Sequence, residues 1–375
     1  MKFSVIGSLA EVSADDWNAL VDPDNPFARH EFLIALEHHN AVGEKFGWLP
    51  HYLLAHEEGV LMAACPMYLK NNSYGEFVFD WDWANAYQRN GLEYYPKLVV
   101  SIPYTPVTGQ RILLRDNSRR DTAQLMIDAA IEHARNLGVS SLHWLFTDAA
   151  DTTGFSQHND YGLRLGCQFH WTNNHYQDFD DYLGTMSSKK RKQIKRERRQ
   201  VKEQGIEFEI LSGHDISTEQ WQIYHRFYSD TFDRKSGYAT LSQGFFQEIA
   251  RTMPDNIVLV MAKYNHEYVA SAFNLRGNNT LYGRHWGCNS EFNNLHFEAC
   301  YYQGLDYCIR NRLQRFEPGA QGEHKISRGF LPTKTWSAHW IASPQFKIAI
   351  NDFLQRETRV MEDYIQELQT HSPFK

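Results

Sequence analysis

The sequence predicts an α/β protein with mixed sheets, built from two related domains in tandem. The chain has 375 residues, which suits two domains because a single hydrophobic core seldom grows beyond about 250–300 residues. Its composition, with 42 % hydrophobic and 22 % charged residues, is that of a globular protein. The same order of elements is indicated twice along the chain, which places the predicted domains at residues 1–178 and 179–375.

In the first half, patterns of apolar residues and turn residues predict a meander of strands followed by a helix and two more strands. The predicted elements are, in order, strands over 51–59, 60–70 and 75–83, a helical start over 90–103, and strands over 141–146 and 166–171.

The second half repeats this order after an opening helix. Residues 187–205 contain strong helix formers and end at Gly205, which predicts that helix. The elements predicted after it are strands over 256–267, 268–277 and 279–288, a helix over 295–313, and strands over 315–320 and 329–336. The repetition favours duplication of one fold, and chance similarity between two α/β halves is the alternative.

The opening helix concentrates positive charge in an acidic chain. Residues 189–199 hold eight basic residues and one Glu, whereas the whole chain has a net charge of −7. One basic segment on an acidic body indicates a localised anion site, for which a tRNA, a nucleotide-linked precursor or a phosphorylated lipid head group is suitable. A solvated surface helix is the alternative. The predicted anion-binding residues are Lys189, Lys190, Arg191, Lys192, Lys195 and Arg196.

Several features indicate a cytoplasmic protein. The five cysteines include no C-x-x-C pair, which favours free thiols in a reducing compartment. The first residues do not resemble a secretory signal, and no uncharged apolar run reaches eighteen residues, so no integral membrane segment is expected. The eighteen histidines lack ligand spacing, so no metal is expected.

Three long stretches, over 77–113, 295–309 and 316–340, resemble a FemAB-like group of N-acyltransferases labelled peptidoglycan biosynthesis or recognition. The basic opening helix also resembles the Fem-type branch of the GNAT superfamily. The resemblance implies two tandem GNAT (acyl-CoA N-acyltransferase-like) domains. It further implies acyl or aminoacyl transfer to the amine of a small molecule or peptide, such as a cell-wall precursor.

The acyl donor is left open. GNAT enzymes that use acetyl-CoA carry an (Arg/Gln)-x-x-Gly-x-(Gly/Ala) turn for the pyrophosphate. The matching junction here, GCNSEFNNLHFEA, has only Gly287. The Fem-type branch also lacks that turn, which favours a carrier other than free CoA, so the donor is aminoacyl-tRNA or acyl-CoA and no tightly bound cofactor is expected. Two alternatives are a non-catalytic GNAT pair that recognises a peptidoglycan precursor or other anionic ligand, and tRNA binding without transfer.

The densest polar cluster, FEPGAQGEHKISRG, is the predicted reacting centre. Lys325 loosely matches a Lys of Fem-type domains, and the resemblance implies that it opposes negative charge on the reacting carbonyl. Glu323 and His324 are candidates for proton removal. A solvated loop is the alternative. Three further polar residues of this segment are predicted to bind substrate: Glu317, Gln321 and Arg328.

The remaining predicted substrate-binding residues lie on neighbouring elements. In the second half, Glu298 on an apolar helix needs a partner, for which Arg284 is a candidate, and a structural Arg–Glu pair is the alternative. In the first half, a strand over 75–83 would place two acids on one face and two tryptophans on the other, which suggests an amine-binding groove. Core aromatics with exposed acids would give the same pattern. These substrate-binding residues are Asp80, Trp81, Asp82, Trp83, Tyr94, Tyr95, Lys97, Arg284, Trp286, Glu298 and Tyr302.

Overall fold

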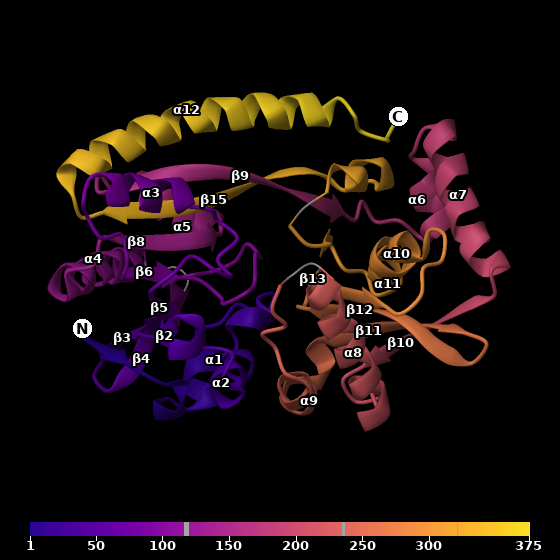
Figure 1. Cartoon of the computed structure of the whole chain (residues 1–375), viewed down its shortest axis with the longest axis horizontal. Coiled ribbons are helices and arrows are strands. Elements are labelled where there is room, and N and C mark those ends of the chain that lie inside the picture. Colours follow the sequence, from indigo (N-terminus) through magenta and orange to yellow (C-terminus); the bar gives the residue numbers. More distant parts are fainter. Residues whose placement is uncertain (116–119, 235–236, 321) are drawn as a thin grey trace. The chain divides into compact units, whose positions relative to one another are not determined.

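The computed structural model describes residues 1–115, 120–234, 237–320 and 322–375 (Figure 1). Contacts between Cα atoms divide the chain into two compact units. The first unit comprises Met1–Cys167 and Lys334–Tyr364, and the second comprises Gln168–Thr333 and Ile365–Lys375. Strand β9 (Tyr161–Thr172) therefore begins in the first unit and ends in the second, and β15 (Leu331–Ile341) runs from the second into the first.

The first unit contains two sheets. The smaller sheet has the order β1-β3-β4-β7, and the larger has the order β2-β5-β6-β8-β15-β9, with β6 and β8 parallel. The strands are β1 Lys2–Ile6, β2 Trp48–Pro50, β3 Tyr52–Glu57, β4 Val60–Cys65, β5 Met67–Lys70, β6 Lys97–Val100, β7 Leu113–Leu114 and β8 Ser141–Thr147. The helices are α1 Ala14–Asn18, α2 His30–His38, α3 Trp81–Arg89, α4 Arg120–Leu137, α5 Ala149–Ser156 and α12 Pro344–Gln369, which passes into the second unit at residue 365.

The core of the first unit forms between α4, α5 and both sheets. On α4 the buried residues recur at three- and four-residue spacing, as at Ile127, Ala130 and Ala134, so one stripe of the helix faces the strands. Trp144 of β8 is fully buried in the same cluster. The first unit therefore has a hydrophobic core of its own.

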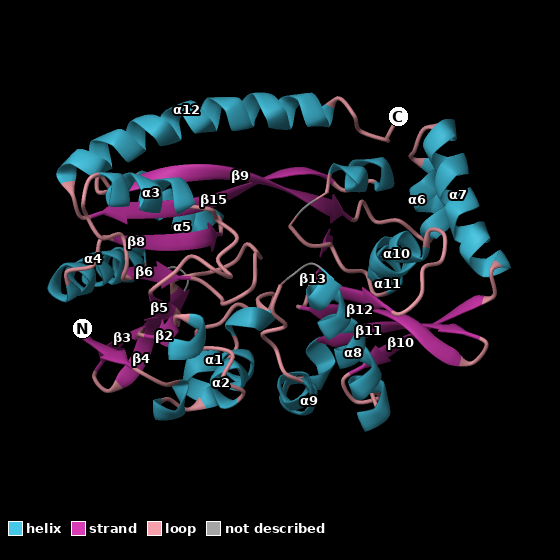
Figure 2. Ribbon diagram, in the orientation of Figure 1, coloured by secondary structure: helices cyan, strands magenta, loops and turns pink. Residues whose placement is uncertain are grey.

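The second unit is a mixed sheet covered by helices (Figure 2). Its sheet has the order β10-β11-β12-β13-β14-β9, with β13 and β14 parallel. The strands are β10 Ile206–Ser212, β11 Ile257–Tyr264, β12 Glu267–Arg276, β13 Thr280–Cys288 and β14 Arg315–Glu317. The helices are α6 Phe179–Gly184, α7 Ser188–Glu203, α8 Thr218–Arg234, α9 Gln243–Thr252, α10 Leu295–Phe297, a π-helical turn Glu298–Tyr302, α11 Gln303–Arg310 and a 3₁₀ helix Glu323–Arg328.

Helix α8 packs closely on β13 in the second unit. A Cβ atom added at Gly287 would lie 2.2 Å from the carbonyl oxygen of Phe227 on α8. Only glycine allows this approach of helix to strand, so Gly287 has a packing role.

The structure confirms most predicted elements. The two hairpins appear as β3–β4 and β11–β12, and the opening helix appears as α7, which ends before Gly205 at a positive φ of 79°. The helix predicted over 295–313 is present, with a π-helical turn inside it.

The strand predicted over 75–83 is wrong. Helix α3 begins at Trp81, and the backbone amides of Trp83 and Ala84 donate to the carbonyl oxygen of Asp80. Trp83 and Tyr87, four residues apart, form its buried face, so the aromatic spacing there has the helical and not the strand period. Trp81 and Asp82 are exposed, whereas Asp80 and Trp83 are buried, so the predicted division into an acidic and an aromatic face is also wrong.

The helical start predicted over 90–103 is wrong as well. Residues 97–100 form strand β6, which pairs with β5 and β8. Pro96 disfavours a helical conformation at the residue before it, and Val99 and Val100 fit a buried strand better than a helix.

Candidate functional site

The second unit contains a pocket of about 490 Å³ between the sheet and the 3₁₀ helix. Its walls come from β12, β13, α8, α10, the π-helical turn, residues 318–320 and the start of the 3₁₀ helix. Arg284 and Trp286 of β13 and Lys325 of the 3₁₀ helix line the same pocket. The loop after β14 therefore folds back toward the GRHWG strand and brings residues about 40 positions apart in sequence to one cavity.

Lys325 lies in the pocket wall with its ammonium hydrogen-bonded. Its side chain is buried, with 2 % exposure, and Nζ donates a hydrogen bond to the carbonyl oxygen of Gly319 at 2.6 Å. The 3₁₀ helix is bounded by Gly322 and Gly329, whose φ values of 114° and 87° let the chain turn sharply on both sides. Burial lowers the pKa of Lys325 to about 8, so the group remains mostly protonated at pH 7.

His324 lines the pocket next to Lys325, and Glu323 does not. The Nε2 atom of His324 lies 2.9 Å from the hydroxyl oxygen of Tyr301. Burial, together with Arg328 and Lys325, lowers the pKa of His324 below its usual range, so the imidazole is neutral at pH 7. Glu323 is exposed. Of the three residues predicted to be catalytic, the structure therefore places Lys325 and His324 at the cavity.

Arg328 lies in the protein core and is paired with an acid from the basic helix. Its Nη2 atom is 3.0 Å from Oε2 of Glu197 on α7, and its guanidinium lies 3.5 Å from the ring centroid of Phe297. Tyr302 donates a hydrogen bond to the same Glu197 oxygen. Through these interactions Glu197 joins α7 to the 3₁₀ helix, which carries Arg328, and to the π-helical turn, which carries Tyr302.

Glu298 is paired with Arg198, where the sequence suggested Arg284. The Arg198 Nη2 atom lies 3.0 Å from Oε1 of Glu298, and Gln303 donates to the same oxygen at 2.8 Å. Burial raises the pKa of Glu298 above its usual range although Arg198 opposes this. Arg284 lines the pocket. Burial lowers the pKa of Arg284 to about 10, and the neighbouring Tyr228 opposes part of this shift.

Two predicted substrate-binding residues of the loop remain. Glu317 is buried, and its Oε1 atom lies 3.1 Å from Nε of Arg315. Gln321 lies outside the described residues.

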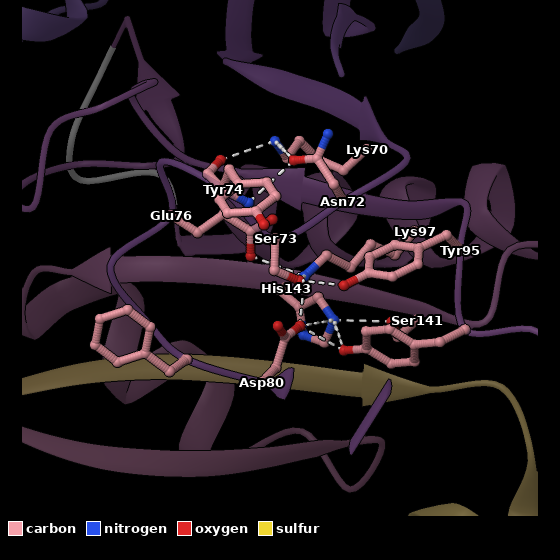
Figure 3. A network of polar contacts seen from close by, with 12 residues as sticks. Lys70, Asn72, Ser73, Tyr74, Glu76, Asp80, Tyr95, Lys97, Ser141 and His143 are labelled. Carbon is pink, nitrogen blue, oxygen red and sulfur yellow. Dashed lines mark hydrogen bonds and ion pairs between the residues drawn. The ribbon is translucent and has the colours of Figure 1, made fainter. Parts of the chain in front are cut away.

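In the first unit, a buried lysine joins two buried acids (Figure 3). The Lys97 ammonium, from β6, donates to Ser73 Oγ at 2.9 Å, to Glu76 Oε2 at 2.8 Å and to Asp80 Oδ2. The side-chain exposures of Lys97, Glu76 and Asp80 are 0 %, 1 % and 3 %. Four of the predicted substrate-binding residues, Asp80, Tyr94, Tyr95 and Lys97, therefore come together in this network.

The network continues through a chain of hydrogen bonds to β8 and β15. Tyr94 donates to Asp80 Oδ2 at 2.6 Å and lies 3.1 Å from His143 Nε2. His143 Nδ1 lies 2.7 Å from His339 Nδ1, so one of these rings donates to the other. Tyr95 lies beside this chain, with its hydroxyl 2.8 Å from Ser73 Oγ.

The charges in this network are set by burial and by Lys97. Burial raises the pKa of Glu76 to about 7 against the opposing effect of Lys97. Burial also raises the pKa of Asp80, but the charge and the hydrogen bond of Lys97 outweigh it and bring the value to about 2. Burial lowers the pKa of His143 to about 3, so its ring is neutral. The Lys97 ammonium is thus matched mainly by the Asp80 carboxylate.

The basic helix α7 presents its charges to solvent. Ile194, Glu197 and Val201 form its buried face, whereas Lys189, Lys192, Lys195 and Arg196 are exposed and Lys190 and Arg191 are half-buried. Lys195 pairs with Asp180 at 2.7 Å. Within the described parts of the chain, the other five of these six cations form no ion pair, so they are available to an anionic partner.

Replacing Lys189, Lys190, Arg191 and Lys192 with Gln should weaken the binding of a short RNA hairpin at least about tenfold at low salt. Filter binding between 50 and 300 mM KCl should also show a shallower salt dependence, because each lost phosphate contact lowers the slope by about 0.7–0.9. The matched control replaces four exposed arginines of the same unit with Gln: Arg226, Arg251, Arg310 and Arg312. Equal binding by both variants would contradict a role of α7 in anion binding.

Sequence reasoning missed Glu197, Arg198, His143 and His339. The two α7 residues lie inside a run that reads as uniformly basic, and the single Glu in that run was the available signal. The histidine pair comes from β8 and β15, which are 196 residues apart, so no local pattern joins them.

In the described residues, no group of three His, Cys, Asp or Glu side chains could hold a metal ion. A search of the helices over the same residues also identifies none with the length and apolar character needed to cross a membrane.

Comparisons with known proteins place the chain in a family. A sequence model of the FemAB_like family, described as peptidoglycan biosynthesis/recognition, matches residues 8–375. No curated protein sequence matches the chain.

Solved structures share the fold at low sequence identity. FemX has a TM-score of 0.55 at 10 % identity, over 94 % of this chain and 100 % of its own. The C-terminal domain of a proposed lysylphosphatidylglycerol synthetase from Agrobacterium fabrum has a TM-score of 0.55 at 9 % identity, over 93 % of this chain and 97 % of its own. A conserved protein from Bacteroides thetaiotaomicron has a TM-score of 0.53 at 10 % identity, over 91 % and 100 %. The predicted mixed α/β fold with two GNAT-like domains is confirmed.

Proposed function

The chain belongs to the FemAB_like family of peptidoglycan biosynthesis/recognition, and from this membership we propose that it is an N-acyltransferase that transfers an acyl or aminoacyl group to an amine. The observation that carries this proposal is Lys325, a buried and mostly protonated lysine in the wall of a pocket of about 490 Å³. A cation held in this way can stabilise negative charge that develops on a reacting carbonyl oxygen.

In the proposed reaction, the nitrogen of a neutral amine attacks the carbonyl carbon of the acyl donor. A C–N bond forms, and the bond between the acyl carbon and the carrier oxygen or sulfur breaks. The Lys325 ammonium stabilises the oxyanion that forms in between. The neutral His324 imidazole accepts the proton from the amine and delivers it to the leaving group.

The donor proposed is aminoacyl-tRNA or acyl-CoA, and the acceptor proposed is the amine of a small molecule or peptide, such as a cell-wall precursor. The exposed cations of α7 support a polyanionic carrier or a nucleotide-linked acceptor, because five of them have no ion pair in the described residues. Gly287 lies within strand β13 and packs against α8, which supports a carrier other than free CoA because the sequence offers no other glycine for a pyrophosphate turn at this junction.

The proposal is tested by supplying labelled aminoacyl-tRNA and labelled acetyl-CoA separately with a synthetic peptidoglycan stem peptide that has a free amine. Mass spectrometry should show a peptide heavier by one acyl group with one of the donors. Binding of the peptide without any mass change, with either donor, would favour the alternative function of a recognition module.

The rate of transfer should fall as the pH rises through about 8. Burial lowers the pKa of Lys325 to about 8, so the protonated fraction that stabilises the oxyanion is lost above that value. A pH profile of kcat/KM measures this, with circular dichroism over the same pH range as the control for folding. In Lys325→Arg the remaining activity should persist to higher pH, because a guanidinium stays protonated. If kcat/KM falls at the same alkaline pH in both proteins, the titrating group is not Lys325.

A further inference from the structure

The charges that line the pocket of the second unit are all of one sign. Among its lining residues in the described part of the chain, Lys325 and Arg284 are cations and none is Asp or Glu. Both cations are charged at pH 7, since burial brings their pKa values only to about 8 and about 10. Burial lowers the pKa values of His285 and His324, so these two rings are neutral. The wall therefore carries positive charge without an acidic group.

The buried carboxylates of the surrounding elements are held by other arginines. The nitrogen–oxygen distances of these pairs are 3.0 Å for Glu298–Arg198, 3.0 Å for Glu197–Arg328 and 3.1 Å for Glu317–Arg315. Glu317 also acts electrostatically on Arg284, which offsets part of one positive charge. Lys325 has no acidic side chain among the causes of its pKa shift and donates to a carbonyl oxygen instead. The excess charge in the pocket is thus centred on Lys325.

The rest of the wall is largely aromatic. Tyr228, Phe232, Phe273, Trp286 and Tyr301 face the same space. Such walls bury the apolar body of a small ligand, while a few polar groups fix its orientation. A volume of about 490 Å³ accommodates a ligand of drug-like size.

We propose that this pocket selects a ligand with an apolar body and an anionic group, either a carboxylate or a phosphate, and rejects one that carries an ammonium. An anion gains from Lys325 and Arg284, whereas an ammonium meets like charge with no acid on the wall to balance it. The identification of that ligand as part of the acyl donor rests on the proposed function, in which an amine of the donor or acceptor enters the pocket in its neutral form. A carboxylate would belong to the acyl group itself, and a phosphate would belong to the carrier.

Four probes of similar shape test the charge preference. Their binding to the full chain is measured by calorimetry at pH 7: 4-phenylbutyrate, 3-phenylpropylphosphonate, 4-phenylbutanamide and 4-phenylbutylamine. We expect at least one of the two anions to bind at least tenfold more tightly than the amine, with the amide between them. The ratio of anion affinity to amine affinity should fall below about threefold in the double variant Arg284→Gln/Lys325→Gln. In the unmodified chain this ratio should decrease as the salt concentration rises. An amine that binds as tightly as the anions in the unmodified chain would overturn the proposal.

A second variant locates the binding. Ala320 lines the pocket and is half-buried, so Ala320→Trp should fill the cavity and abolish binding of all four probes with little effect on folding. Binding that survives in this variant would place the probes elsewhere and overturn the proposal. Tighter binding of the butyrate than of the phosphonate supports an acyl carboxylate, and the reverse supports a carrier phosphate.

These measurements need no turnover, so the two proposals can fail separately. If the chain prefers anions but transfers no acyl group, the pocket proposal is supported and the proposed function is contradicted. If the chain transfers an acyl group but its pocket prefers the amine, the proposed function is supported and the pocket proposal is contradicted.

Discussion

Replacing Lys325 with methionine should lower the rate of acyl transfer by about 100- to 1,000-fold, the usual cost of removing one donor that stabilises an oxyanion. Methionine has nearly the same length and fills the same buried space, so the pocket should keep its shape. The hydrogen bond from Nζ to the Gly319 carbonyl oxygen would be lost, which costs about 1 kcal/mol of stability. The measurement is kcat/KM with the donor and acceptor that give turnover in the labelling assay.

The matched control for that experiment is Lys263→Met in the same unit. Lys263 pairs with Glu209 on neighbouring strands at a partly exposed position, so its loss should leave the rate unchanged. Turnover in Lys325→Met that equals that of Lys263→Met would remove Lys325 from the mechanism. Circular dichroism of both variants separates a loss of chemistry from a loss of fold.

In the first unit, Lys97→Met should lower the free energy of unfolding by about 3–5 kcal/mol, because it leaves the carboxylates of Glu76 and Asp80 buried without their cation. The difference in free energy of unfolding between Lys97→Met and the unmodified chain should become smaller as the pH is lowered from 8 to 6. Burial already raises the pKa of Glu76 to about 7 with Lys97 present, and removal of the ammonium raises it further, so acid neutralises the uncompensated charge. Denaturant unfolding at several pH values measures both effects.

Two comparisons make this test specific. Lys347→Met removes a partly exposed ion pair with Asp160 in the same unit and should cost only about 0–1 kcal/mol. The triple variant Glu76→Gln/Asp80→Asn/Lys97→Met removes all three charges and should recover much of the lost stability. A deficit in Lys97→Met that is as small as in Lys347→Met would show that the two acids do not depend on Lys97.

Regular patterns made much of the fold predictable. The hairpins β3–β4 and β11–β12 follow from strands joined by short turns, and α7 follows from its helix formers and Gly205. The failure over 75–83 has a definite cause. Aromatic residues at every second position resemble a strand, yet Phe77 and Phe79 precede the helix and Trp81 and Trp83 lie within it. A period of two within so few residues does not separate a strand from the entry to a helix.

The candidate site was predictable where its residues are close in sequence. The polar cluster around Lys325 supplied two pocket residues, and the GRHWG strand supplied Arg284 and Trp286. The partners that fix the surrounding side chains come from distant segments. Glu197, which holds Arg328, lies 131 residues earlier in the chain. Such pairings depend on the tertiary fold, so composition and spacing do not indicate them.

The crossing of β9 and β15 between the units has a consequence for synthesis of the protein. Strand β15 lies between β8 and β9 in the large sheet of the first unit, a central position. A ribosome releases the chain from the N-terminus, so residues 168–330 emerge before this strand does. Most of the first unit is translated before the second unit, yet the first unit is the last to gain its complete sheet. Until then the edges of β8 and β9 lack their partner and depend on protection from aggregation.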